Sequence, residues 1–498
     1  MSVSEYSLQE HEDLETSDFS DSDDDEETPL LPYSSEMVES MRRRTPLPLL
    51  AIAITYFLQV CEPLTSQSIY PYINQLVREL DVTGGDERRV GYYAGLIESI
   101  FFATEAVCVL HWSRASDHVG RKPILLIGTF GSMTSMLCFG LSRTFWALVV
   151  SRALTGLLNG NTGVMKSIMG ELTDSTNRAE AFAPMPLVWS LGSTLGPLIG
   201  GTLSRPHDNF PGVFRAQFWQ EYPYFLPCAV TAGYVACAFL LTLTLFKENL
   251  QTIPKGHRRN ASERPVPIRK LLTYPVIISI SNYTALAFLG VMLNALLPLF
   301  LSTHRVYGGL GLSASLIGYL LAAYGASSGI FQIFFFAKII RRLGEKRVFV
   351  AGISMFIPVF SLMPIISRLA RTSESQDAFA SSSQALSPVV WVLIAAMLTC
   401  LAFMDLAYGA IFMFITTASP NRASLGATNG LSQASVSTFR AVGPALASSL
   451  FSFTLEHNVL GGNFVYILML SFAFLAIALS TRLPSHVWVE MDPESDTE

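Results

Sequence analysis

The chain has 498 residues, of which 50% are hydrophobic and only 14% are charged, and its mean hydropathy is +0.40. A water-soluble domain could not hide this much apolar surface in a core, so the composition excludes an ordinary soluble protein and indicates a membrane protein. The net charge of −6 comes from the ends: residues 1–40 hold 14 acidic residues and residues 483–498 hold 5, with no Lys or Arg in either segment.

Residues 1–45 are polar and acidic, and we expect them to form a disordered tail because they carry too few apolar residues to build a core. They do not have the basic start and short apolar region of a secretory signal. Glu26 with Leu30 and Leu31 resembles an acidic dileucine signal that sorts proteins to vacuoles or lysosomes. Matches this short also arise by chance, so both interpretations stay open.

Twelve apolar runs follow the tail, and each is long enough for a helix of about 20 residues that crosses the hydrocarbon core. They lie at roughly 46–75, 90–112, 123–142, 144–170, 180–203, 222–246, 271–302, 313–337, 348–367, 389–415, 424–453 and 463–482. The fold class predicted is an all-α membrane protein. All six cysteines fall inside these runs, so we expect no disulfides.

The distribution of Lys and Arg predicts the orientation. With both termini in the cytoplasm, the cytoplasmic segments hold 21 basic residues and the opposite loops hold nine. The longest cytoplasmic polar stretch, 247–270, separates two six-helix halves at 46–246 and 271–482. Residues 483–498 then form a second acidic cytoplasmic tail.

The segment "SRASDHVGRK" (113–122) places charges between spans 2 and 3, and "AKIIRRLGEKRV" (337–348) occupies the corresponding place in the second half. Both combine a glycine with basic residues, which indicates a weak internal repeat of the kind found in transporters. The first copy offers a latch built from Asp117, Gly120, Arg121 and Lys122. The alternative is a loop whose cations only fix the topology.

Span 5 carries "GSTLGPLIGG", in which Gly192, Gly196 and Gly200 recur every four residues. They therefore share one helix face and allow a neighbouring helix to come close. Pro197 removes a backbone donor and bends the helix, and Gly201 completes the set. A smooth, bent helix at the junction of two halves suits a rocking motion, although static packing also uses small residues.

These motifs resemble those of the major facilitator superfamily. The segment 113–122 is similar to the family's loop signature G-x-L-A-D-R-x-G-R-K, with Ser113, Ala115 and His118 departing from it. Span 4 contains Arg152, Gly156 and Gly160 in an R-x-x-x-G pattern, and span 5 fills every fixed position of the motif of the drug:proton antiporter branch. "MKSIMGELTDSTNRAEAFA" and "FRAVGPALASSLF" are similar to fungal and plant zinc-induced facilitator-like carriers. The resemblance implies the twelve-helix major facilitator fold and proton-coupled export, with the span 4 arginine linked to proton coupling.

Ionisable residues inside membrane spans are costly and usually functional. The candidates for proton coupling are Glu62, Glu98, Glu105, Arg152, Asp405 and Arg440. A carboxylic acid among apolar groups holds a proton more readily than one in water, so it can load and release a proton as access alternates. Arg152 is the natural partner for one of the acids. For Asp405 and Arg440 the alternative is a permanent structural ion pair between spans 10 and 11.

Polar and aromatic residues at mid-depth could line a substrate cavity. These candidates are Gln59, Trp189, Asn282, Tyr283, Asn294, Tyr408, Asn429 and Gln433. The acids outnumber the well-buried arginines, which favours cationic or basic organic substrates.

We therefore predict a proton-coupled exporter of small organic molecules, with an uptake symporter of the same fold and a non-transporting sensor as alternatives. No nucleophile constellation indicates an enzyme, and no phosphate-binding glycine loop indicates an ATP-driven pump. We expect no cofactor and no metal, because the proton gradient supplies the energy. The expected partners are the substrate, protons and the bilayer, with no nucleic acid, and the expected state is a monomer in the plasma membrane or, alternatively, the vacuolar membrane.

Overall fold

The computed structural model describes residues 46–173, 177, 181, 184–247, 268–377, 386–420, 424–485 and 487. The chain from Leu47 onward forms one compact unit. Every regular element within the described residues is a helix. The dileucine prediction at Glu26, Leu30 and Leu31, and most of the 247–270 loop, lie outside the described residues.

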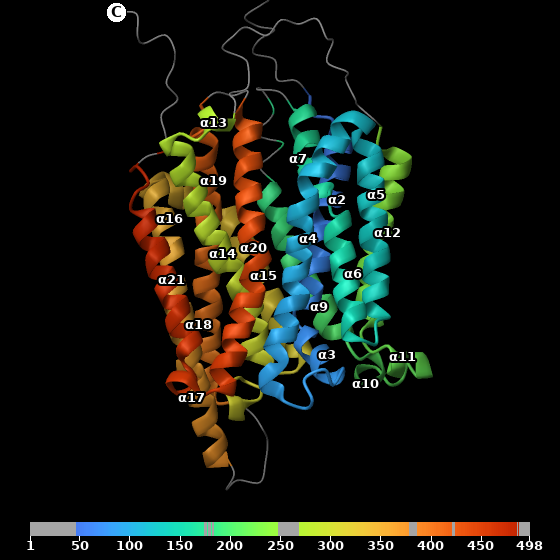
Figure 1. Ribbon diagram of the computed structural model, residues 1–498, viewed down its shortest axis with the longest axis vertical. Helices are drawn as coiled ribbons and strands as arrows, with labels where there is room; N and C mark the ends of the chain where they lie inside the picture. Colours follow the sequence, from blue (N-terminus) through green and yellow to red (C-terminus); the bar gives the residue numbers. More distant parts are fainter. Residues whose placement is uncertain are drawn as a thin grey trace, which may run out of the picture. The chain divides into compact units, whose positions relative to one another are not determined.

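Each of the six apolar runs of the N-terminal half contains at least one helix (Figure 1). Their bounds are α2 Leu49–Ile69, α3 Ile73–Glu79, α4 Val90–Val119, α5 Arg121–Gly140, α6 Phe145–Leu158, α7 Asn161–Glu171, α9 Met185–Leu203, α10 Pro206–Asn209, α11 Gln217–Glu221 and α12 Phe225–Leu245.

The C-terminal half repeats the pattern. Its helices are α13 Ile268–Leu271, α14 Tyr274–Ser302, α15 Ala314–Leu343, α16 Glu345–Ser354, α17 Phe356–Asp377, α18 Pro388–Met404, α19 Leu406–Thr417, α20 Leu425–Glu456 and α21 Phe464–Ser480. Short 3₁₀ turns precede α4, α15 and α21.

Length and apolarity alone qualify eight of the described helical segments as membrane spans, and Leu187–Leu203 and Phe464–Ser480 are shorter apolar helices. Two of the predicted apolar runs form neither a long apolar helix nor a shorter one by these criteria. Run 144–170 is split into α6 and α7, and run 424–453 forms the long α20, which is rich in Ser, Thr, Asn and Gln. We call the side where α2 begins and α21 ends the inner side, and the opposite side the outer side.

The two related turns differ from the predicted loops. α4 continues to Val119 and α15 to Leu343, so most of both charged segments is helical. Residues 113–119 contain no Gly or Pro, and the helix therefore ends only at Gly120, whose φ of +116° is unfavourable for a residue with a side chain. Gly344 ends α15 in the same way with φ +80°. The internal repeat thus extends to backbone conformation.

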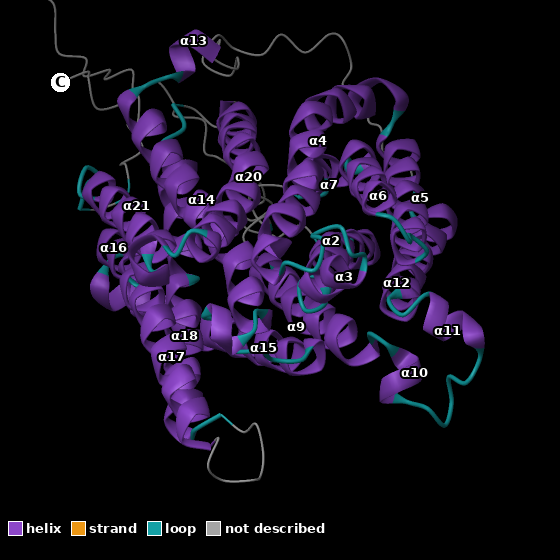
Figure 2. Cartoon of the chain, turned by 60° about the horizontal axis from the view of Figure 1, so that its bottom comes forward, coloured by secondary structure: helices purple, strands orange, loops and turns teal. Residues whose placement is uncertain are grey.

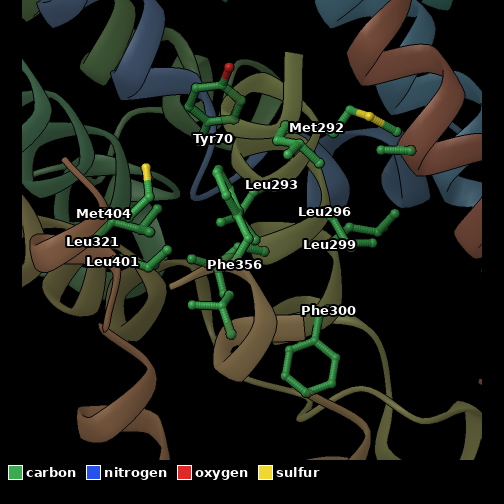
Figure 3. Packing of buried hydrophobic residues seen from close by; sticks show 14 of the residues in the cluster. Tyr70, Met292, Leu293, Leu296, Leu299, Phe300, Leu321, Phe356, Leu401 and Met404 are labelled. Atoms are coloured by element: carbon green, nitrogen blue, oxygen red, sulfur yellow. The ribbon is translucent and has the colours of Figure 1, made fainter. Parts of the chain in front are cut away.

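The largest hydrophobic cluster joins the halves around α14. This helix is apolar on all sides, and 83% of its most apolar window is buried, as expected for a helix enclosed by others. Figure 3 shows Tyr70, from the end of α2, beside Met292 and Leu293 of α14. The most extensive contacts between the halves are those of α4 with α20 and of α9 with α15 (Figures 1 and 2).

Candidate functional site

Two buried acids lie on one face of α4, two helical turns apart. Glu98 is 5% exposed and Glu105 is 8% exposed. The charge of Arg152, from α6, acts on Glu98, yet no ion pair within 4.0 Å joins these two described residues. Within the described residues, Glu98 Oε2 and Arg152 Nε have no hydrogen-bond partner, and the Arg152 guanidinium stands 4.7 Å above the Phe101 ring. An acid that loses its proton becomes negatively charged and attracts a nearby arginine. Release of the proton therefore favours direct pairing of the two side chains.

The break between α6 and α7 positions the second acid. Asn159, the first residue after α6, donates a hydrogen bond from Nδ2 to Glu105 Oε1 at 2.9 Å. α6 can approach α4 this closely because Gly156 has no side chain: a Cβ there would overlap the Phe101 carbonyl oxygen and the Thr104 hydroxyl. The R-x-x-x-G pattern thus has a structural cause, since its glycine seats the arginine helix on the helix of the acids.

A narrow internal pocket links Glu62 to Arg152. Its polar lining includes both charged residues together with Asn159 and Asn161, and its free space of about 20 Å³ is enough for about one water molecule. Asn161 Oδ1 is buried without a partner, so a water there would satisfy it. The pocket therefore lies between an acid of α2 and the arginine of α6, and a water molecule in it would contact polar groups of both helices.

In the C-terminal half, Asp405 lies at the break between α18 and α19. Its carboxylate accepts a hydrogen bond from Tyr324 Oη at 2.8 Å and another from Ser328 Oγ, both from α15. Gln332 Nε2 donates to the Asp405 carbonyl at 3.3 Å. No ion pair joins Asp405 to Arg440 in the described chain, so the structure does not contain the permanent pair that was one of the two sequence interpretations.

Arg440 of α20 instead faces tyrosines and the acids of the other half. Tyr283 and Tyr408 lie near its guanidinium, and the carboxylates of Glu105 and Glu62 lie within electrostatic range across the junction of the halves. Tyr283 also accepts a weak hydrogen bond from Gln433 Nε2 at 3.5 Å. Charged acids of the N-terminal half therefore attract the arginine of the C-terminal half across the junction.

The candidate cavity residues differ in how exposed their side chains are. Asn294, Asn429 and Trp189 are exposed, and Gln59, Tyr408 and Gln433 are partly exposed. Tyr283 is buried but lies at 6.5 Å from Tyr408, centroid to centroid. Asn282 corrects the prediction: it is fully buried, and its Nδ2 donates to the Ile278 carbonyl of its own helix at 2.8 Å, so it faces packed protein.

The glycines of α9 hold it against two helices. Gly192, Gly196 and Gly200 face α2, where added Cβ atoms would collide with Pro63, Leu64 and Ser68. On another face, Gly201 and the Pro197 carbonyl meet Gly318 of α15, with a Cβ on Gly201 only 2.8 Å from the Gly318 Cα. The motif therefore sits at the junction of the halves, with α2 on one side and α15 on the other.

At the inner end of α4, the predicted latch is partly visible. Arg121 pairs with Glu171 at the end of α7 at 2.7 Å and also bonds Ser116, while Lys122 Nζ donates to the Leu243 carbonyl at 2.9 Å. Gly120 supplies the turn. The side chain of Asp117 lies outside the described residues. These contacts tie α4, α5, α7 and α12 together within the N-terminal half.

The described polar contacts between the halves lie at the outer side or at mid-depth. Arg89 pairs with Glu456 at 2.8 Å, and Arg78 Nη1 donates to the Ser302 carbonyl at 3.1 Å. At mid-depth, the Ala445 amide, next to Pro444 in α20, donates to Ser99 Oγ at 2.8 Å. The inner part of α20 is exposed at Asn429, on the face that carries Arg440, and at the adjacent Gly430. The outer side is thus the side that these contacts hold closed.

Sequence reasoning missed three residues of the site, Tyr324, Ser328 and Asn159. Tyr324 and Ser328 are four residues apart in an apolar run, so a search for polar pairs on one helix face would have found them. Asn159 lies in "LNGNTG", whose two glycines could have indicated a helix break beside an acid.

A family model described as Major Facilitator Superfamily matches residues 55–308. The efflux pump azaK of Aspergillus niger is 30% identical over 445 residues, covering 88% of this chain and 88% of that protein. Protein ZINC INDUCED FACILITATOR 1 of Arabidopsis thaliana is 27% identical over 445 residues, covering 84% of this chain and 87% of that protein. A crystal structure of a bacterial homologue of the human lysosomal transporter Spinster, in an inward-facing and occupied conformation, has a TM-score of 0.63 at 16% identity and covers 88% of this chain and 97% of that one.

Proposed function

Because the chain belongs to the major facilitator superfamily and is a multi-pass membrane transporter, we propose that it exports small organic molecules in exchange for protons. The exchange alternates between a state closed at the outer side and a state closed at the inner side. The observation that carries the proposal is the pair of buried acids on α4, Glu98 and Glu105, beside the buried Arg152 of α6.

The central charges support proton coupling in particular. Glu98 and Arg152 lie near each other without a direct ion pair, and Glu105 and Glu62 act on Arg440 across the junction. When a proton neutralises one of these acids, the attraction that it exerts on an arginine is lost. Because the acids and Arg440 belong to opposite halves, this change in attraction alters how strongly the halves hold together at mid-depth.

Export is supported by the α9 motif and by a relative. The motif of Gly192, Gly196, Pro197, Gly200 and Gly201 lies between α2 and α15, where the halves would roll on each other. The relative azaK is named an efflux pump. With acids in excess at the centre, we propose organic cations or weak bases as the substrate class, and no cofactor besides the proton gradient.

The orientation and the membrane are also part of the proposal. The excess of Lys and Arg on the inner side supports a cytoplasmic inner side and hence cytoplasmic termini. A substrate would then enter from the cytosol past Asn429 and leave at the face closed by Arg89 and Glu456. The plasma membrane is the first membrane to examine, and the vacuolar membrane the second.

The proposal is tested in inverted vesicles that contain the full chain, acidified inside, with ethidium and a panel of small organic cations as probes. Wild type should accumulate at least one probe, and Glu98→Gln and Arg152→Ala should lose accumulation. Glu221→Gln, which alters an outer-loop ion pair with Arg143, is the matched control and should behave like wild type. Retained gradient-driven accumulation in both Glu98→Gln and Arg152→Ala would refute the assignment of the coupling residues.

A further inference from the structure

A second pocket lies in the C-terminal half, between α14, α20 and α21, and has a volume of about 340 Å³. We call it the lateral groove. It is lined by Ser281, Thr284, Ala285, Phe288, Leu289, Ser435, Phe439, Phe472, Leu475, Ala476 and Leu479. None of these residues belongs to the central site described above.

The lateral groove opens away from the central site. Successive residues of an α-helix are about 100° apart, so Ser435 lies about 200° around α20 from Gln433. Phe439 lies one turn further along α20 than Ser435, on the same side of the helix. Gln433 and Arg440 share a different side, which faces the central site. Leu475 of α21 is 67% exposed and Phe439 is 48% exposed. In a membrane-embedded bundle, the side of these helices that faces away from the centre borders the lipid.

The interior of the lateral groove suits an apolar chain. Its lining, as far as the structure describes the chain, holds no charged residue. Two of its three hydroxyl groups satisfy each other, since Thr284 Oγ1 and Ser435 Oγ lie 2.9 Å apart in a hydrogen bond. Phe288 packs against Phe439 and Phe472 at centroid distances of 5.7 and 6.1 Å and forms an aromatic wall. A polar ligand would lose its hydration there with few bonds in return.

The inner end of the lateral groove leads to positive charges. Leu479 is one residue from the end of α21, and Arg482 follows three residues later and is exposed. Tyr274 Oη donates to the Arg482 carbonyl at 3.5 Å, which places the start of α14 at the same level. The exposed Arg269 and Lys270 of α13 come just before α14. An apolar slot with Arg482 at its inner end, and with two further cations just before α14, matches a lipid with a negative head group.

We propose that the lateral groove binds an acyl chain of an anionic phospholipid from the inner-side leaflet, with the lipid phosphate held by Arg482 and the cations of α13. The lipid fills the gap between α14, α20 and α21 and stabilises the contact of these helices. The substrate path on the opposite face of α20 stays separate from it.

The test uses the purified full chain in nanodiscs of equal parts phosphatidylglycerol and phosphatidylcholine, followed by native mass spectrometry of the lipids retained. Wild type should retain one phosphatidylglycerol. Ala476→Phe, which fills the groove, should lower its retention at least fivefold, and Arg482→Gln should bring the ratio of the two lipids close to one. Leu240→Phe, at an exposed site on α12, is the matched control and should match wild type. Equal retention in Ala476→Phe and wild type, or an unchanged lipid ratio in Arg482→Gln, would overturn the proposal.

A second measurement covers the case in which Ala476→Phe fails to fold. Leu475→Trp places a fluorophore at the mouth of the groove, where its exposed site tolerates the change. Its added fluorescence should be quenched more by brominated-chain phosphatidylglycerol than by brominated-chain phosphatidylcholine. Leu240→Trp should be quenched equally by both. Equal quenching of Leu475→Trp by the two lipids would contradict a site for an anionic lipid.

Discussion

Replacing Gly200 by Ala tests whether the glycines of α9 matter through close helix packing. A Cβ on Gly200 would overlap the Ser68 carbonyl oxygen and stand 2.8 Å from the Ser68 carbonyl carbon, where ordinary contact begins at 3.4 Å. These atoms are backbone, so no side-chain rotation relieves the overlap and α2 must move away from α9. Overpacking of this kind costs about 1–3 kcal/mol.

The matched control is Gly233→Ala, in the middle of α12, where an added Cβ meets no atom within 4 Å. Both substitutions gain the helix-forming advantage of Ala over Gly, about 0.5–1 kcal/mol, so the difference between them isolates the packing term. Thermal unfolding of the purified proteins in one detergent should give a lower midpoint for Gly200→Ala than for Gly233→Ala. Equal midpoints, or a higher one for Gly200→Ala, would refute the packing argument.

Three further predictions concern the two ends of the transport path. Glu456→Gln removes the ion pair with Arg89 and should favour outward opening by about 0.2–1 kcal/mol, as for a partly exposed pair. Spin-label distances across the outer side would detect this opening. Unchanged distances would contradict an ion pair that holds the outer side closed. The Arg88 guanidinium holds the pKa of Asp86 below its usual range. Ionised Asp86 therefore stabilises the folded state at every pH above its pKa of about 3.9 in the unfolded chain. This contribution is lost only as the pH falls through the lower pKa of the folded state. Hydrogen exchange at residues 86–90, corrected for the intrinsic rate, should therefore be equal at pH 7 and pH 5, and protection lost at pH 5 would be inconsistent with this. Gly430→Cys should react with a thiol reagent from the inner side, because a Cβ there has open space, and protection of that thiol would mean that the inner side is closed.

The helical architecture could be predicted from the sequence because each span needs a long apolar run, and all twelve runs contain helices. The spacing of Gly192, Gly196 and Gly200 likewise predicted one contact face, since helix periodicity alone fixes it. Which helix meets that face could not be predicted, because the approach of α2 depends on the arrangement of the whole bundle.

The candidate site was predictable only in part, for the same reason. Glu98, Glu105 and Arg152 could be singled out from the sequence because they are charged residues inside long apolar runs. The partners of Asp405 come from α15, about 80 residues earlier in the chain, and no local pattern reports such a contact. Asn282 was assigned to the cavity because it is polar and lies at mid-depth. α14 is apolar all round, so its sequence does not distinguish a central face from a packed one.

The most direct test of the account is the proton movement that a substrate gradient drives. Proteoliposomes that hold the full chain and a trapped pH-sensitive dye would receive a transported probe on one side only, with no pH gradient imposed. Exchange predicts that protons move opposite to the probe, and that Glu98→Gln abolishes this proton movement. A probe that crosses without any change in pH, or protons that travel in the same direction as the probe, would contradict proton-coupled export.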